Sequence, residues 1–122
     1  MKKTVRVLVV DDSALMRKLI PGILEQDKSI EVVGTAVDGH FALKKIEDLA
    51  PDVITLDLEM PGMNGIELAK YVSDTCSDTK ILLLSGQAAV SDLLRQAREL
   101  GYSFELLAKP LHPDQLIEKL RG

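Results

Sequence analysis

Short apolar runs alternate along this chain with longer stretches in which apolar residues recur every three or four positions. The run Val5–Val10 holds only valine and leucine apart from Arg6, a pattern typical of a strand that is buried on both faces of a sheet. A helix is expected after it, with Ser13 as its N-cap. The apolar stripe of this helix consists of Leu15, Leu19 and Ile23, with Met16, Ile20 and Leu24 beside them.

The same alternation continues to the end of the chain. Further strands are expected over residues 30–36, 53–56, 81–84 and 104–108, with Asp57 and Ser85 directly after the second and third of these. Further helices are expected over 39–49, over 64–73 with Asn64 as cap, and over a stripe made of Val90, Leu93, Leu94, Ala97 and Leu100 that Gly101 closes. Pro113 is expected to open the last helix, with Leu116, Ile117 and Leu120 on its apolar face.

Five strands that alternate with five helices predict an α/β fold, a mostly parallel sheet with helices on both faces. A length of 122 residues suits one domain, so a single domain over 1–122 is expected. One feature conflicts with the pattern. Pro21 and Gly22 fall inside the first helix, where proline removes a backbone hydrogen bond, so a kink without a break is expected there.

Composition narrows the classes of function. The net charge is −4 and tryptophan is absent, which argues against direct binding of nucleic acid. Cys76 is the single cysteine, so no intramolecular disulfide can form; a spectator thiol in a reducing compartment is expected. No run reaches the ~18 apolar residues of a membrane span, and no signal peptide is recognisable. A cytoplasmic protein without a membrane partner is therefore predicted.

Residues that carry chemistry stand at the ends of four expected strands. They are Asp11 and Asp12 after the first strand, Asp57 after the third, Ser85 after the fourth and Lys109 after the fifth. Each of them alone is compatible with a solvated loop or a turn. Because the carboxyl ends of parallel strands meet at one edge of the sheet, where ligands bind in such folds, the set together favours a shared site.

The chemistry of this set suits phosphoryl transfer. The clustered carboxylates of Asp11, Asp12 and Asp57 resist joint ionisation, and Mg²⁺ relieves such repulsion while keeping several waters and a phosphate as ligands. Asp57 can then act as a nucleophile toward a phosphoryl group. Lys109 and the hydroxyl of Ser85 supply a charge and a donor to the phosphoryl oxygens.

The segments that carry these residues resemble the receiver domains of two-component response regulators, over nearly the whole chain. They are residues 9–13 (VVDDS), 57–65 (DLEMPGMNG), 84–86 (LSG) and 108–110 (AKP). The resemblance implies a doubly wound, flavodoxin-like (βα)5 fold whose five-stranded parallel sheet has the order 2-1-3-4-5.

The resemblance also implies roles for single residues. Asp12 and Asp57 would bind Mg²⁺ directly, the backbone carbonyl of Glu59 would be the third protein ligand, and Asp11 would act through a metal-bound water. Asp57 would be the phosphoacceptor, with a switch hydroxyl and a phosphate-binding lysine opposite it. Those two residues are Ser85 and Lys109.

What a receiver domain does follows from the same resemblance. A sensor histidine kinase, or a small phosphodonor, would phosphorylate Asp57, and the surface of the fourth helix, fifth strand and fifth helix would then control an effector domain or a partner protein. Such a chain is a signalling switch that catalyses only its own phosphorylation and dephosphorylation. Whether it also forms a homodimer through the same surface is left open. One position departs from the family pattern: Leu106 stands where many receivers carry an aromatic, and neither Tyr102 nor Phe104 matches it.

Two other classes share parts of the pattern. A haloacid-dehalogenase-like phosphatase also uses an aspartate nucleophile with Mg²⁺, but it needs an aspartate where Glu59 stands and is usually longer. A flavodoxin-like FMN module shares the topology, but an acidic edge repels phosphate unless a metal is bound. Residues 7–17 and 52–60 resemble receivers of chemotaxis methylesterases, and the C-terminal half resembles them less. Whether the chain is a stand-alone regulator or is cut from a longer one stays open.

Overall fold

The computed structural model describes residues 4–59, 65–76, 78–86 and 90–121, and within them strands and helices alternate from end to end. The strands are β1 (Val5–Val10), β2 (Ile30–Ala36), β3 (Val53–Asp57), β4 (Lys80–Ser85) and β5 (Glu105–Ala108). The helices are α1 (Ala14–Leu24), α2 (Gly39–Leu49), α3 (Gly65–Thr75), α4 (Val90–Glu99) and α5 (Pro113–Arg121). The predicted α/β alternation is confirmed.

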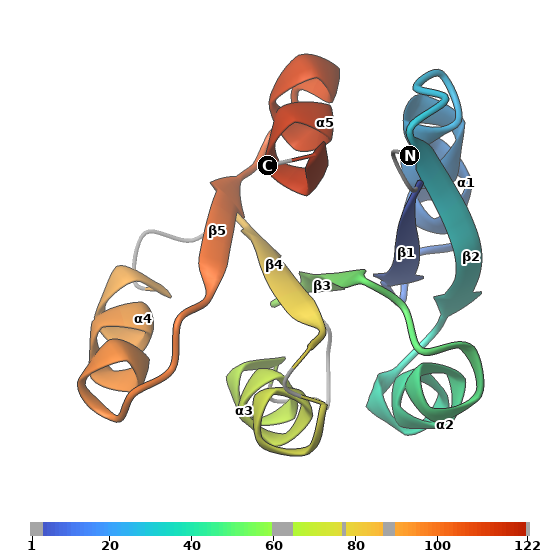
Figure 1. Ribbon diagram of the computed structural model, residues 1–122. Coiled ribbons are helices and arrows are strands. Elements are labelled where there is room, and N and C mark those ends of the chain that lie inside the picture. Colours follow the sequence, from blue (N-terminus) through green and yellow to red (C-terminus); the bar gives the residue numbers. More distant parts are fainter. Residues whose placement is uncertain (1–3, 60–64, 77, 87–89, 122) are drawn as a thin grey trace.

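The strands form one parallel sheet in the order β2-β1-β3-β4-β5, the order that the resemblance implied. Helices α1 and α5 cover one face of this sheet and α2, α3 and α4 cover the other (Figure 1). The strand order reverses between β1 and β3, because β2 lies beyond β1 while the chain continues on the other side of β3. In folds of this kind the crevice at that reversal, outside the carboxyl ends of the strands, is where ligands bind.

The core has two layers because successive side chains of a strand point to opposite faces. Leu8 and Val10 pack toward α2, α3 and α4, whereas Val7 and Val9 pack toward α1 and α5. Helices cover both layers, which explains why the central strands are apolar at nearly every position.

Helix α1 buries a different stripe from the one expected. Ile20 and Leu24 are buried and Met16 packs beside them, but Leu15 is 65% exposed and Leu19 is 48% exposed. At 3.6 residues per turn, a residue lies about 100° around the helix from its neighbour, so the positions just before Met16 and Ile20 turn away from the sheet. The helix continues through Pro21, so the expectation that proline would not break it is confirmed.

Smaller differences concern α3 and α4. Helix α3 runs to Thr75, two residues beyond the expected end, and the predicted cap Asn64 lies outside the described residues. In α4, Leu94 and Ala97 are buried as expected, but Leu100 is 68% exposed because the helix ends at Glu99. Gly101 follows with φ +97, the left-handed conformation that favours glycine after a helix.

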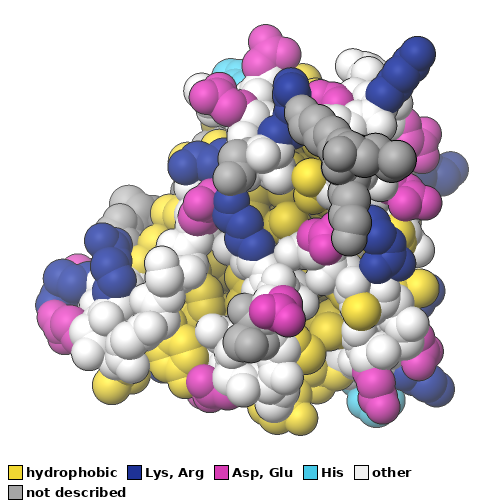
Figure 2. Space-filling view, in the orientation of Figure 1, with side chains coloured by type: hydrophobic (Ala, Val, Ile, Leu, Met, Phe, Trp, Pro, Cys, Tyr) yellow, Lys and Arg dark blue, Asp and Glu magenta, His cyan; other side chains and the backbone are white. Residues whose placement is uncertain are grey.

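The surface carries charges of both signs. Acidic and basic side chains are interspersed over the face shown in Figure 2, with hydrophobic side chains visible between the helices. Among the helices that the structure describes, none combines the length and the apolar composition that a bilayer crossing requires.

Candidate functional site

The sheet register brings the predicted site residues to one edge. Leu56 pairs with Val10 and Asp57 pairs with Leu84, so the last residues of β1, β3 and β4 end at nearly the same level. Ser85 pairs with Ala108 in the same way. Asp11, Asp12 and Lys109 directly follow these strand ends. This register places the residues that carry chemistry at the carboxyl edge of the sheet, where the sequence led us to expect them.

Three carboxylates form a tight group at this edge. Each of Asp11, Asp12 and Asp57 offers an oxygen, and these oxygens all lie within 4.8 Å of one another. Asp11 and Asp57 are buried, whereas Asp12 is exposed. The acid doublet therefore splits into one buried and one solvated carboxylate.

Asp11 is only half satisfied in this group. Its Oδ1 accepts a hydrogen bond of 2.9 Å from the backbone N–H of Ser13, but its buried Oδ2 has no hydrogen-bond partner among the described residues. Burial raises the pKa of Asp11, and the charges of Asp57 and Asp12 raise it further, against the opposing effects of the Ser13 N–H and Lys109. An unpartnered buried oxygen in an acidic cluster is the kind of atom that a cation satisfies.

We predict that Asp11→Asn stabilises the metal-free domain by about 1–2 kcal/mol, because it removes the ionised form whose buried oxygen lacks a partner. The folded state holds the Asp11 proton more tightly than the unfolded state, so ionisation lowers stability as pH rises from about 3.8, its ordinary pKa, through the raised folded pKa. The advantage of the variant should therefore be small near pH 3 and should grow through that range. Urea unfolding in EDTA at a series of pH values measures it.

Asp38→Asn is the matched control, since it makes the same charge change at an exposed position. Asp38 caps α2 by accepting the Phe41 N–H at 3.0 Å, and asparagine caps as well as aspartate. An advantage of Asp11→Asn that stayed constant with pH would contradict the account of Asp11.

Lys109 forms an ion pair with Asp57, a member of the acidic group. Its Nζ lies 2.9 Å from Asp57 Oδ1, and the backbone N–H of Glu59 donates to the same oxygen at 2.9 Å. Burial alone would lower the pKa of Lys109, but its hydrogen bonds and ion pairs with Asp57 and Glu59 outweigh burial and raise it. The Lys109 backbone N–H donates to the Ser85 carbonyl at 2.9 Å, and the Lys109–Pro110 peptide is cis. The ammonium is thus held beside Asp57 from the end of β5.

The side chain of Glu59 makes contacts within the site that were not predicted from the sequence. Its Oε1 accepts the N–H of Gly86 at 2.9 Å and lies 3.2 Å from Lys109 Nζ. Burial opposes its ionisation, but hydrogen bonds from the Ser85 hydroxyl, Gly86 and Lys109 outweigh burial and lower the pKa of Glu59. The family resemblance implied a role for the backbone carbonyl of Glu59 only. The Glu59 carboxylate instead links the ends of β3, β4 and β5 through its contacts with Gly86 and Lys109. The one sequence feature that could have predicted this contact is the lysine expected at the same edge of the sheet as the acidic residues.

Leu106 lies behind the site, on the side of α4. It pairs with Leu83 and packs against the core layer under α2, α3 and α4. Tyr102 stacks on Phe104 at a centroid distance of 5.6 Å, and its hydroxyl donates to Asp74 at 2.8 Å. These two aromatics therefore contact each other and α3, and an aliphatic side chain occupies position 106.

Comparison with known proteins agrees with this geometry. The family model described as the response regulator receiver domain matches residues 7–121. A protein-glutamate methylesterase/protein-glutamine glutaminase of Koribacter versatilis is 49% identical over 106 residues, and one of Halalkalibacterium halodurans is 46% identical over 122 residues. The matches cover 87% and 99% of this chain but only 29% and 35% of those relatives. The chain thus spans about a third of their length.

Similar solved structures also include chemotaxis proteins and response regulator domains. The response regulator domain of Thermotoga maritima CheB superposes with a TM-score of 0.80 at 34% identity, covering 98% of this chain and 95% of that one. The chemotaxis protein CheY4 of Vibrio cholerae superposes with a TM-score of 0.83 at 32% identity, covering 97% of both chains. Strand order, the residues at the strand ends and the family match agree, and this chain belongs to the response regulator receiver domain family.

Proposed function

We propose that this domain accepts a phosphoryl group on Asp57 and transmits the change to the surface formed by α4, β5 and α5. One observation carries the proposal: Asp57, buried at the end of β3, lies between two other carboxylates within 4.8 Å and an ammonium at 2.9 Å. A nucleophilic carboxylate flanked by a cation site and a fixed positive charge is what phosphoryl transfer requires.

The residues present fit Mg²⁺. The unpartnered Oδ2 of Asp11 and the crowding of three carboxylates both favour a hard divalent cation with oxygen ligands. We assign Asp12 and Asp57 as direct ligands, together with the backbone carbonyl of Glu59, and Asp11 as a ligand through water. When bound, the metal neutralises charge on the oxygens of the transferring group.

The transfer itself needs little more from the chain. A carboxylate oxygen of Asp57 forms the new bond to phosphorus while the bond from phosphorus to the donor breaks, and the electron pair leaves with the donor. The donor is a phosphohistidine of a sensor kinase or a small acyl phosphate. Lys109 and the hydroxyl of Ser85 then donate to two oxygens of the phosphoryl group, in charge-assisted hydrogen bonds.

The phosphatase alternative fits less well. Such an enzyme needs a general acid two residues after the nucleophile, and here that position is Glu59. Its lowered pKa keeps the carboxylate ionised, so it has no proton to give to a leaving group near neutral pH. We therefore propose that turnover by this chain is limited to its own phosphorylation and dephosphorylation.

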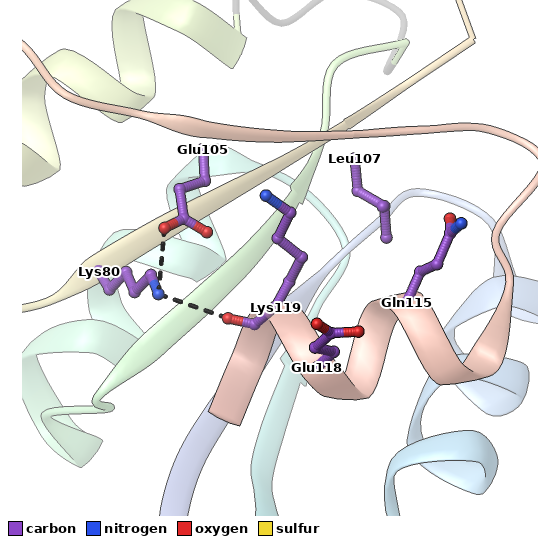
Figure 3. A pocket seen from close by; sticks show the side chains of 6 residues that line it. All are labelled: Lys80, Glu105, Leu107, Gln115, Glu118 and Lys119. Carbon is purple, nitrogen blue, oxygen red and sulfur yellow. Dashed lines mark hydrogen bonds and ion pairs between the residues drawn. The ribbon is translucent and has the colours of Figure 1, made fainter. Parts of the chain in front are cut away.

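The proposed output surface includes a groove of about 510 Å³ between β5 and α5, with Leu107 and Gln115 among its lining residues (Figure 3). Lys80 ties this region together, because its Nζ lies 3.3 Å from Glu105 and donates to the Lys119 carbonyl at 3.4 Å. These contacts lie at the start of β4, the end opposite Ser85. We propose that α5 is anchored at this end, and that a response to phosphorylation begins at the Ser85 and Lys109 end.

The partners follow from the family. We propose a sensor histidine kinase as phosphodonor. Because relatives named as methylesterases are about three times as long as this chain, we propose that the output surface contacts an effector domain of that type. Binding to a separate partner protein, or a homodimer through the same surface, are the other arrangements that an interaction assay would distinguish.

Mg²⁺ should raise the melting temperature of the domain, because an ion that binds only the folded state stabilises it by mass action. At 100 times its dissociation constant the gain is about 2.7 kcal/mol. Asp12→Ala removes a proposed direct ligand and should abolish most of this gain. The check is thermal unfolding with MgCl₂ against NaCl of equal ionic strength, and equal melting temperatures in the two salts would refute the metal assignment.

Beryllofluoride with Mg²⁺, which mimics an acyl phosphate, should shift the methyl resonances of Leu106 and Leu94. The reason is that the Ser85 hydroxyl is drawn toward the new anion, which displaces the end of β4, and Leu106 pairs with Leu83 of that strand and packs on the side of α4. Because leucine has no hydroxyl to fix its direction, the shifts should be modest. Methyl NMR decides: changes confined to residues beside Asp12, Asp57 and Lys109 would show that this domain does not signal through α4.

A further inference from the structure

We propose that the Glu59 carboxylate occupies, in the resting domain, the place that a phosphoryl oxygen takes after phosphorylation, and that this built-in anion limits how readily the site accepts its group. The proposal rests on the proposed function of Asp57. It makes Glu59 a positioning residue that must turn away before the site is filled.

The contacts of Glu59 are those of a bound anion. Its Oε1 accepts the Gly86 N–H at 2.9 Å and lies 3.2 Å from Lys109 Nζ. Lys109 is one of the groups that the proposed function assigns to phosphoryl oxygens, and the other donor, the Gly86 N–H, directly follows Ser85 at the end of β4. The Glu59 carboxylate therefore engages an ammonium that the transferred group needs.

Electrostatic repulsion prevents the Glu59 carboxylate and a phosphoryl group on Asp57 from binding the same donors at the same time. Lys109 Nζ is shared between Asp57 Oδ1 at 2.9 Å and Glu59 Oε1 at 3.2 Å, so a phosphoryl oxygen that arrives at the same ammonium would meet the negative charge of Glu59 directly. Like charges at hydrogen-bond distance disfavour each other strongly. Glu59 has to leave these donors when a phosphoryl group arrives on Asp57.

The local structure allows the side chain to leave while the backbone stays. The Leu58 N–H donates to the Leu84 carbonyl at 3.0 Å and the Glu59 N–H donates to Asp57 Oδ1 at 2.9 Å, so hydrogen bonds hold the main chain at Leu58 and at Glu59 itself. The Glu59 side chain is 25% exposed, in contrast to 7% for Asp57. Rotation of one partly exposed side chain into water is sufficient to open the site.

Two variants test the proposal, both with the full chain. Glu59→Gln removes the charge and keeps the shape, and Glu59→Ala removes the carboxylate altogether. Calorimetric titration with beryllofluoride in excess Mg²⁺ should show binding roughly tenfold tighter than wild type for both, which is the effect of removing a single competing contact. In the resting protein without metal, the Gly86 amide proton should move upfield in both variants: most in Glu59→Ala, which loses the acceptor, and less in Glu59→Gln, whose neutral amide oxygen is a weaker acceptor.

Glu47→Gln is the matched control, since Glu47 lies exposed near the end of α2 and the net charge changes equally. It should change neither the affinity nor the Gly86 resonance. If wild type binds beryllofluoride but the Glu59 variants bind it equally or more weakly, the inference fails alone. An unmoved Gly86 amide also overturns it. If wild type binds no beryllofluoride at all, the proposed function fails and the inference fails with it.

Discussion

Replacing Asp57 by asparagine should abolish phosphorylation of the domain by acetyl phosphate in the presence of Mg²⁺. An amide offers no anionic oxygen to attack phosphorus, so the loss is complete and not a matter of degree. The fold should persist, because asparagine matches the volume of aspartate and its Oδ1 still accepts from Lys109 and the Glu59 N–H, each at 2.9 Å in the wild type. Intact-protein mass spectrometry after incubation gives the answer: one added phosphoryl group on wild type and none on the variant.

Asp52→Asn provides the control at the other end of β3. Asp52 is exposed and accepts the Arg6 backbone N–H at 2.9 Å, a contact that asparagine can also make. This variant should be labelled like wild type. Labelling of the Asp57→Asn protein to the wild-type extent would remove Asp57 from the role of phosphoacceptor.

Lys109→Met should slow phosphorylation by about 10²-fold, the loss seen when one fixed donor to a developing charge is removed from a catalytic site. Methionine keeps much of the length of the side chain and none of its charge. The ammonium lies 2.9 Å from Asp57 Oδ1, so the variant loses the positive charge that would face the transferred oxygens. The rate of acetyl phosphate labelling, followed by mass over time, measures the effect.

Lys80→Met makes the same chemical change at the opposite end of β4. Lys80 also has an acidic partner, Glu105 at 3.3 Å, and so controls for the loss of an ion pair as such. It should be labelled at the wild-type rate. A Lys109→Met protein with wild-type kinetics would place Lys109 outside the transfer step.

Much of this architecture was predictable from the sequence, because apolar residues follow one another without interruption in buried parallel strands but recur every three or four positions in amphipathic helices. The sequence also predicted which residues would end the strands, and parallel register then brought Asp57, Ser85 and Lys109 together. The strand order itself came from the family resemblance, since alternation alone does not determine which strands are neighbours.

Other features depended on tertiary contacts that no local pattern contains. Periodicity marked Leu15 and Leu19 as core, but a helix that covers one face of a sheet buries a narrow stripe, and these two side chains fall beside it. The doublet Asp11-Asp12 did not reveal which acid would be buried. The Glu59 carboxylate was missed because its partner Gly86 lies 27 residues away, on a neighbouring strand end.

The central claim, that Asp57 receives the phosphoryl group, is tested most directly by locating the acyl phosphate. Borohydride reduces an aspartyl phosphate to homoserine, which marks the modified position permanently. After labelling with acetyl phosphate and Mg²⁺, reduction and proteolysis, peptide mass spectrometry should find homoserine at position 57 and unmodified aspartate at positions 11 and 12. Homoserine at either of those positions, or at none after labelling, would contradict the account.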